Sequence, residues 1–157
     1  MAFISFENIA GDGKLKKVPD GYSDLDWNNF FAIDDDYYLG TNFEKAIRTG
    51  EAAAFNGLED PAGFKSADRF NDFDLNSGHF AAFNADDLRV KVVAYDDGEK
   101  VATKFLVLDP SREFVRFGPL FDSIDEVRFT PRGGTDADPD DGIPVFHTFG
   151  VDDLFII

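Results

Sequence analysis

The chain contains no cysteine, which excludes disulfide bonds, thiolate catalysis and thiolate metal sites. This absence leaves the cellular compartment open, because exported proteins can lack cysteine as well. No apolar run approaches the ~20 residues that a membrane-spanning helix needs, so membrane insertion is not expected. No basic start followed by an apolar segment occurs either, so we expect no signal peptide within the chain.

Basic residues are also scarce. The chain has 15 Lys and Arg against 31 Asp and Glu, and its formal net charge is -16. Such a surface repels phosphate, so nucleic acid and anionic membranes are disfavoured partners. It suits cations or a high-salt environment. Phenylalanine is abundant, with 19 copies in 157 residues, and this apolar content argues against disorder.

The apolar residues recur with a period of two, which is typical of β-strands with one buried face. In "LRVKVVAY", Leu88, Val90 and Val92 lie on one face, whereas Arg89 and Lys91 lie on the other. Helical periodicity is scarce. The pattern therefore predicts an all-β chain.

Turn signals separate the predicted strands. The Asp96–Gly98 stretch in "YDDGEKV" predicts a β-hairpin. One short helix is expected at 42–48, and the composition of 131–144 predicts a loop. We expect residues 1–157 to form a single antiparallel β-sandwich domain of jelly-roll type.

Two adjacent carboxylates, Asp152 and Asp153, interrupt the final apolar strand "VFHTFGVDDLFII". A buried carboxylate needs a basic partner, a proton or a metal ion, and no Lys or Arg is close in sequence. Glu7 lies in the predicted first strand, which in a sandwich is commonly a neighbour of the last. We therefore expect calcium bound by Glu7, Asp152 and Asp153. The alternative is that these aspartates face solvent or accept hydrogen bonds at a sheet edge.

Several short motifs occur in an order that resembles a known family. They are an N-terminal Phe-Glu, "GYSDLDWNNFFAI", "GEAAAFNG", "FDLNSGHFAAF" and a closing "VDDL". Together they resemble the galactose-binding-like jelly-roll fold of carbohydrate-binding modules, and more closely the exported bacterial jelly-roll domains found in PEP-CTERM proteins. The resemblance implies a structural calcium at Glu7 and Asp152, with Asp153 where such domains often have Asn. It also implies a carbohydrate ligand and a secreted or cell-surface location.

A second acidic cluster occurs in "GTDADPDDG". Asp136, Asp138 and Asp140 are candidates for a second metal site, although the loop lacks the Glu at position twelve that an EF-hand needs. The alternative is a solvated acidic loop.

The aromatic residues divide into core and ligand candidates. Trp27 alternates with polar residues and is predicted to lie in the core. Tyr37 and Tyr38 lie beside a predicted turn and are the candidates for stacking against a sugar. His79 and His147 show no catalytic or metal-binding spacing, which favours structural roles.

The function expected from the sequence is a non-enzymatic, calcium-stabilised module that binds carbohydrate. One alternative is a structural or adhesion component of a cell surface or matrix, in which calcium promotes self-association. Another is a glycan-cleaving enzyme, since glycoside hydrolysis needs two carboxyl groups. Small size argues against the enzyme, and among 31 acidic residues some pair always looks suitable.

Overall fold

The computed structural model describes residues 2–9, 14–34 and 45–157. Strands dominate this part of the chain, and its short 3-10 helices include η3 (Gly57–Glu59) and η4 (Pro119–Phe121). No helix among the described residues is long and apolar enough to cross a membrane. The strands of the described ranges are β1 (Ala2–Ile4), β2 (Lys16–Lys17), β3 (Leu25–Asn28), β4 (Phe30–Asp34), β5 (Ala52–Asn56), β6 (Ala62–Ser66), β7 (Leu75–Ala82), β8 (Ala85–Asp96), β9 (Glu99–Leu108), β10 (Glu113–Arg116), β11 (Glu126–Asp136) and β12 (Phe149–Ile156).

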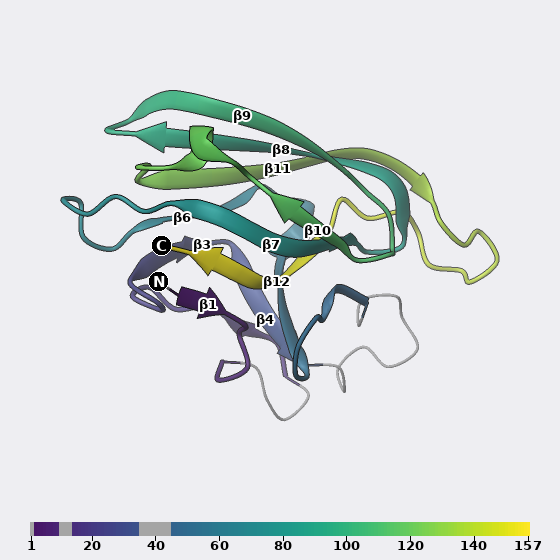
Figure 1. The fold of residues 1–157 in the computed structure, drawn as a ribbon. Helices are drawn as coiled ribbons and strands as arrows, with labels where there is room; N and C mark the ends of the chain where they lie inside the picture. The colour runs from purple at the N-terminus through teal and green to yellow at the C-terminus, as the bar shows by residue number, and fades with distance from the viewer. Residues whose placement is uncertain (1, 10–13, 35–44) are drawn as a thin grey trace.

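These strands form two antiparallel sheets that pack face to face (Figure 1). The seven-stranded sheet has the order β10-β7-β12-β5-β4-β2, with β1 also pairing with β12, and the five-stranded sheet has the order β3-β6-β11-β8-β9. From β5 onward the chain passes from one sheet to the other at every connection except the β8–β9 hairpin. The quartets β5-β12-β7-β10 and β6-β11-β8-β9 are the two halves of a jelly roll. The predicted fold class is therefore confirmed.

The two ends of the chain lie side by side at the seven-stranded sheet (Figure 1). Strand β1 pairs antiparallel with β12, so that Ala2 lies opposite Ile156 and Ile4 lies opposite Leu154. The predicted pairing of first and last strands is thus confirmed. Glu7, however, lies in a turn after β1 and not within the strand, because β1 ends at Ile4.

The core between the sheets is rich in aromatic rings. The alternating residues Leu88, Val90 and Val92 are fully buried, as their period predicted. The largest fully buried side chains include seven phenylalanines: Phe6, Phe30, Phe64, Phe80, Phe121, Phe129 and Phe149. Edge-to-face contacts join several of these rings, which adds to the free energy gained from their buried area.

The hairpin predicted from "YDDGEKV" is present. Asp96 pairs with Glu99, which leaves Asp97 and Gly98 as a two-residue turn with φ angles of 50° and 82°. Two consecutive positive φ angles define a type I′ turn, and Asp-Gly is a preferred sequence for it.

The loop prediction for residues 131–144 is wrong over its first part. Residues from Pro131 to Asp136 continue β11, and Pro131 pairs with Val90 of β8. Proline is accommodated because β6 ends its pairing opposite Phe129, so that this part of β11 is a sheet edge on its other side. Of the helix expected at 42–48, residues 42–44 lie outside the described residues, residues 45–46 are in a 3-10 turn, and residues 47–48 are not helical, so the prediction is wrong at its C-terminal end.

Candidate functional site

The adjacent aspartates of β12 lie at a β-bulge. Asp152 pairs with His79, but the next pair joins Phe155 to Ser77, so Asp153 and Leu154 together oppose one residue of β7. Asp153 has a φ of 48°, a left-handed conformation that Asp and Asn adopt more readily than most residues. The bulge explains how two neighbouring carboxylates can occur in a strand without either one entering the core.

Asp152 is completely buried and its carboxylate accepts three backbone hydrogen bonds. The Oδ2 atom accepts from the N–H groups of Arg48, at 2.6 Å, and of Thr49, at 3.0 Å. The Oδ1 atom accepts from the N–H of Asp153 at 2.7 Å. The strand therefore keeps this carboxylate because backbone donors satisfy it, although β12 lies between β5 and β7 and not at a sheet edge as the alternative to calcium supposed.

Glu7 holds the same loop from the other end of the chain. Its carboxylate accepts hydrogen bonds from the N–H of Glu51 and from the N–H of Ala52, the latter at 2.9 Å. Gly50, between the two anchored stretches, has a φ of 63°, and a Cβ atom there would overlap the Glu7 carboxylate. The glycine is required both by the backbone conformation and by this close approach.

We call these elements the terminal carboxylate site: Glu7, Asp152, Asp153 and the loop 48–52. The Thr49 hydroxyl donates to Oδ1 of Asp153 at 2.6 Å, so the third acidic residue contacts the same loop. All three residues that the sequence predicted as calcium ligands thus contact the same loop. Within the described residues, however, their oxygens do not form a set of three within 4.8 Å of one another.

The electrostatics of this site are unfavourable for a bare carboxylate. Burial raises the pKa of Asp152 to about 6, and the neighbouring Asp153 carboxylate raises it as well, against the lowering effect of the backbone donors. Among the described residues the one ion pair within 4.0 Å is Arg128 with Glu126, on the other sheet. No basic side chain in the described part of the chain therefore compensates Asp152 within that distance.

A pH dependence of stability follows for the calcium-free protein. The Asp152 pKa of about 6 in the folded state exceeds the ~3.9 of an unfolded aspartate, so the folded state retains a proton that the unfolded state releases. This contribution to stability is present at low pH and is lost as pH rises through about 6. Urea titration with chelator measures the unfolding free energies of the unaltered protein and of Asp152→Asn. The value for the unaltered protein minus the value for the variant should increase as pH falls from 7. A difference that is flat with pH would contradict the raised pKa.

The second predicted metal cluster adopts a different arrangement. Oδ1 of Asp136 accepts from the N–H of Asp138 at 3.0 Å, and Oδ1 of Asp138 accepts from the N–H of Asp140 at 3.4 Å. These are local turns in which each side chain hydrogen-bonds to the backbone two residues further on. A second metal at Asp136, Asp138 and Asp140 stays a prediction.

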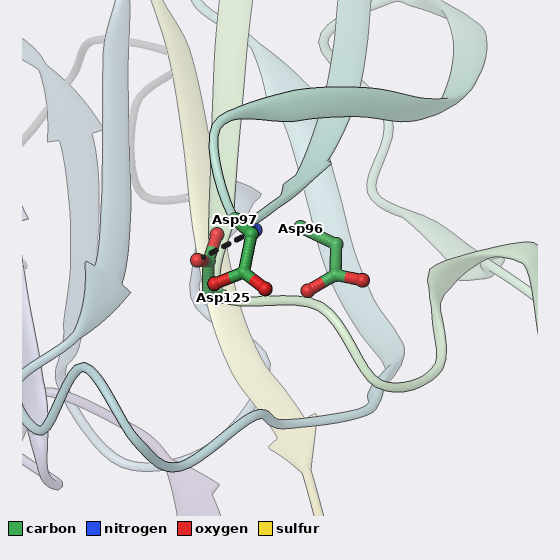
Figure 2. A group of neighbouring side chains, drawn as sticks. All are labelled: Asp96, Asp97 and Asp125. Carbon is green, nitrogen blue, oxygen red and sulfur yellow. Dashed lines mark hydrogen bonds between the residues drawn. The ribbon is translucent and has the colours of Figure 1, made fainter.

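One further group of acidic side chains comes together in the described ranges, and the sequence analysis did not predict it. One oxygen of each of Asp96, Asp97 and Asp125 lies within 4.8 Å of the others (Figure 2). Asp125 Oδ2 accepts from the N–H of Asp97 at 3.0 Å, so it stabilises the β8–β9 turn. The cluster is explained by that turn, and we assign it no ligand.

An aromatic groove crosses the outer face of the seven-stranded sheet. Phe3, Phe155, Ser77 and Arg116 occupy one row across β1, β12, β7 and β10, as the strand register places them. The rings of Phe3 and Phe155 stack with centroids 4.5 Å apart. The groove has a volume of about 410 Å³ and is lined by Phe3, Asn76, Ser77, Phe114, Arg116, Gly118 and Phe155.

The groove presents both apolar rings and polar side chains to solvent. Phe3 is 71% exposed and Phe114 is 52% exposed. The Arg116 guanidinium lies 5.5 Å from the Phe114 ring centroid. The pairing of β12 with β7 shifts register after Phe155, so Asn76 of β7 has no partner residue in β12. As a result, Asn76 and Ser77 both line the groove although they are neighbours in sequence.

A second hollow, of about 470 Å³, lies beside β4 and β5 and is mainly apolar. The Asn56 side chain in this hollow is already used by the fold, since its amide nitrogen donates to the carbonyl oxygen of His147 and its amide oxygen accepts from the N–H of Phe149. Glu59 accepts from the N–H of His147. The residues that line this hollow are Leu15, Phe31, Phe55, Asn56, Gly57, Leu58, Glu59, Phe83, Phe146 and Thr148.

The remaining sequence candidates have separate outcomes. Tyr37 and Tyr38, the predicted sugar-stacking residues, lie outside the described residues. Trp27 is 3% exposed, so its predicted core position is confirmed. His79 packs against the Phe114 ring, with centroids 5.0 Å apart, at the side of the groove.

Comparisons with known proteins identify a similar fold and no family. No protein-family model matches the chain, and no curated protein matches it. Among solved structures, the chain is similar to TmCBM61, a carbohydrate-binding module solved in complex with β-1,4-galactotriose. The match covers 98% of this chain and 93% of that chain, with 8% sequence identity and a TM-score of 0.47. At these values the likeness assigns neither a ligand nor a binding residue to this chain.

Proposed function

We propose that this protein is a non-catalytic module that binds neutral oligosaccharide in the aromatic groove of the seven-stranded sheet, and that calcium stabilises it at the terminal carboxylate site. The observation that carries the proposal is the combination of solvent-exposed rings and polar side chains in one groove. Phe3 and Phe114 supply the rings, and Asn76, Ser77 and Arg116 supply hydrogen-bonding groups.

This combination suits a sugar because a pyranose ring has apolar C–H surfaces and a rim of hydroxyl groups. An exposed phenylalanine ring binds the apolar surface, and a few placed polar groups fix the orientation of the hydroxyls. Arg116 and Ser77 make no side-chain hydrogen bond to another described residue, so both are free to contact a ligand. The mainly apolar hollow beside β5 offers less of this chemistry, because the Asn56 and Glu59 side chains that line it already bond to the backbone.

A binding role fits the groove better than catalysis does. Glycoside hydrolysis requires two carboxyl groups that flank the scissile bond. The described residues that line the groove include one titratable side chain, Arg116, and no Asp or Glu. A guanidinium stays protonated at physiological pH, so it serves as a hydrogen-bond donor and not as a general acid or base.

Calcium is supported by the chemistry of the terminal carboxylate site. Glu7, Asp152 and Asp153 supply hard oxygen ligands, and the backbone carbonyls of the loop they hold are ligands of the same kind. The buried Asp152 beside Asp153 carries negative charge that no described cation offsets within 4.0 Å. A bound divalent cation would neutralise this charge and join both ends of the chain to one loop.

The groove is tested by truncating Phe114, the ring that β10 contributes to it. Phe114→Ala should weaken oligosaccharide binding at least tenfold, which corresponds to about 1.4 kcal/mol, because a stacking surface is lost. The matched control is Phe70→Ala, which removes another exposed phenylalanine with an arginine above it, Arg69 at 4.7 Å. A neutral-glycan array followed by calorimetry on the best ligand measures both variants. Equal loss in both variants, or no binding to any neutral glycan, would count against the proposal.

A further inference from the structure

A row of cations lies on the outer face of the five-stranded sheet, on the opposite side of the molecule from the groove. In β8 the inward residues Leu88, Val90 and Val92 are buried, while Arg89 and Lys91 are exposed on the other face. On β11 the register places Arg132 directly opposite Arg89, and Thr130 opposite Lys91. We call Arg89, Lys91 and Arg132 the basic face.

The basic face is unusual in a chain of formal net charge -16. Like charges directly opposite each other on neighbouring strands destabilise a sheet. Arg89 and Arg132 are such a pair, and within the described residues neither lies within 4.0 Å of a carboxylate. Arg128, on the same face, differs because it pairs with Glu126 and lies over the Tyr95 ring.

The two arginines open onto a hollow of about 540 Å³. Gly133 and Gly134 line it without side chains and have φ angles of 74° and 93°, so the chain turns there with little steric bulk. Exposed apolar side chains lie alongside on β9, where Val107 pairs with Arg89 and Phe105 pairs with Lys91. The full lining is Asp87, Arg89, Val107, Arg132, Gly133, Gly134 and Thr135.

We propose that the basic face binds an acidic polysaccharide, with Arg89 and Arg132 holding one sugar carboxylate between them. Two guanidinium groups can share a carboxylate through charge-assisted hydrogen bonds, which removes the repulsion between them. Val107 and Phe105 offer apolar surface to the adjoining sugar ring. Lys91 lies two residues after Arg89 on the same face of β8, where it binds the carboxylate of the next sugar. Asp87 is the one carboxylate among the described residues that line the hollow, against two guanidinium groups, and the screening length of about 8 Å at physiological salt weakens the effect of the more distant negative surface.

The inference is separate from the proposed function, because it uses a different sheet and a charged ligand. The experiment compares uronate oligosaccharides (galacturonate, mannuronate and guluronate oligomers) with their methyl esters, which keep the ring and lose the charge. Binding is measured by calorimetry at one fixed free calcium concentration, because uronates themselves bind calcium. The acidic forms should bind, and the esters should bind at least tenfold more weakly, a difference of about 1.4 kcal/mol.

Two double variants locate the site. Arg89→Gln with Arg132→Gln should reduce uronate affinity at least tenfold and leave the melting temperature unchanged or raised, because a repulsive pair is removed. The control is Lys16→Gln with Lys17→Gln, an equal change of charge on exposed β2 of the other sheet, and it should leave affinity nearly unchanged. An equal loss of uronate affinity in both double variants would overturn the inference. So would binding of the methyl esters, or of a single-stranded oligonucleotide, with the same affinity as the uronates. Failure to bind any uronate would overturn it as well.

Discussion

Replacement of Trp27 by alanine should remove about 3–5 kcal/mol from the free energy of unfolding, the cost typical of truncating a large core ring. Trp27 is 3% exposed and packs against Phe6, Phe30 and Phe64, with ring centroids 5.0 to 5.6 Å away. Its indole N–H donates to the carbonyl oxygen of Tyr22 at 2.9 Å. Truncation therefore leaves a cavity and removes one of the two hydrogen bonds that the Tyr22 carbonyl oxygen accepts, the other coming from the N–H of Leu25.

Urea unfolding of Trp27→Ala measures this loss, and Trp27→Phe serves as the control. The phenylalanine variant fills part of the volume but lacks the indole N–H and the rest of the ring, so its stability should lie between those of the alanine variant and the unaltered protein. Fluorescence of the single tryptophan should be blue-shifted and poorly quenched by acrylamide. Red-shifted, readily quenched emission with a near-native melting temperature for Trp27→Ala would place this residue on the surface instead.

Calcium should raise the melting temperature, and chelator should lower it. At a calcium concentration about 100-fold above the dissociation constant, the gain in unfolding free energy is about 2.7 kcal/mol. The physical reason is that an ion at the terminal carboxylate site binds the folded state, in which Glu7 and Asp152 hold one loop, and not the unfolded chain. Differential scanning calorimetry with calcium and with chelator, at equal ionic strength, measures the effect.

Two variants distinguish this site from general screening of an acidic surface. Asp152→Asn should abolish the calcium response, because it removes a buried anionic ligand. The double variant Asp136→Asn with Asp138→Asn removes two carboxylates whose side chains cap their own loop, and it should keep the response. If the double variant loses the response and Asp152→Asn retains it, the ion binds in the loop and not at the chain ends.

The fold was largely predictable because the strands alternate apolar and polar residues over long runs. Residues 88–92 of β8 show one face that is buried and one that carries charge, and the Asp97–Gly98 turn defines the hairpin that follows. The β11 extension through Pro131 was not predictable, because Pro and Gly indicate a loop locally. Only the tertiary arrangement shows that this proline lies beyond the end of β6, where the sheet needs no N–H from it.

The sites were less predictable than the fold. The convergence of Glu7 and Asp152 was predictable in part, because carboxylates in apolar strands require an explanation. The bulge at Asp153 was not, since a positive φ leaves little trace in one sequence beyond a preference for Asp or Asn. The groove was missed because Phe3, Ser77 and Arg116 are far apart in the chain and each looks ordinary in its own strand.

The position of β12 has a consequence for the order of folding. This strand lies between β5 and β7 in the seven-stranded sheet and also pairs with β1, yet it spans residues 149–156. During synthesis the sheet stays divided until these residues emerge, and β5 and β7 expose backbone edges that another strand can pair with. Pairings between such distant segments form slowly, so the nascent chain passes through an interval in which aggregation competes with closure of the sheet.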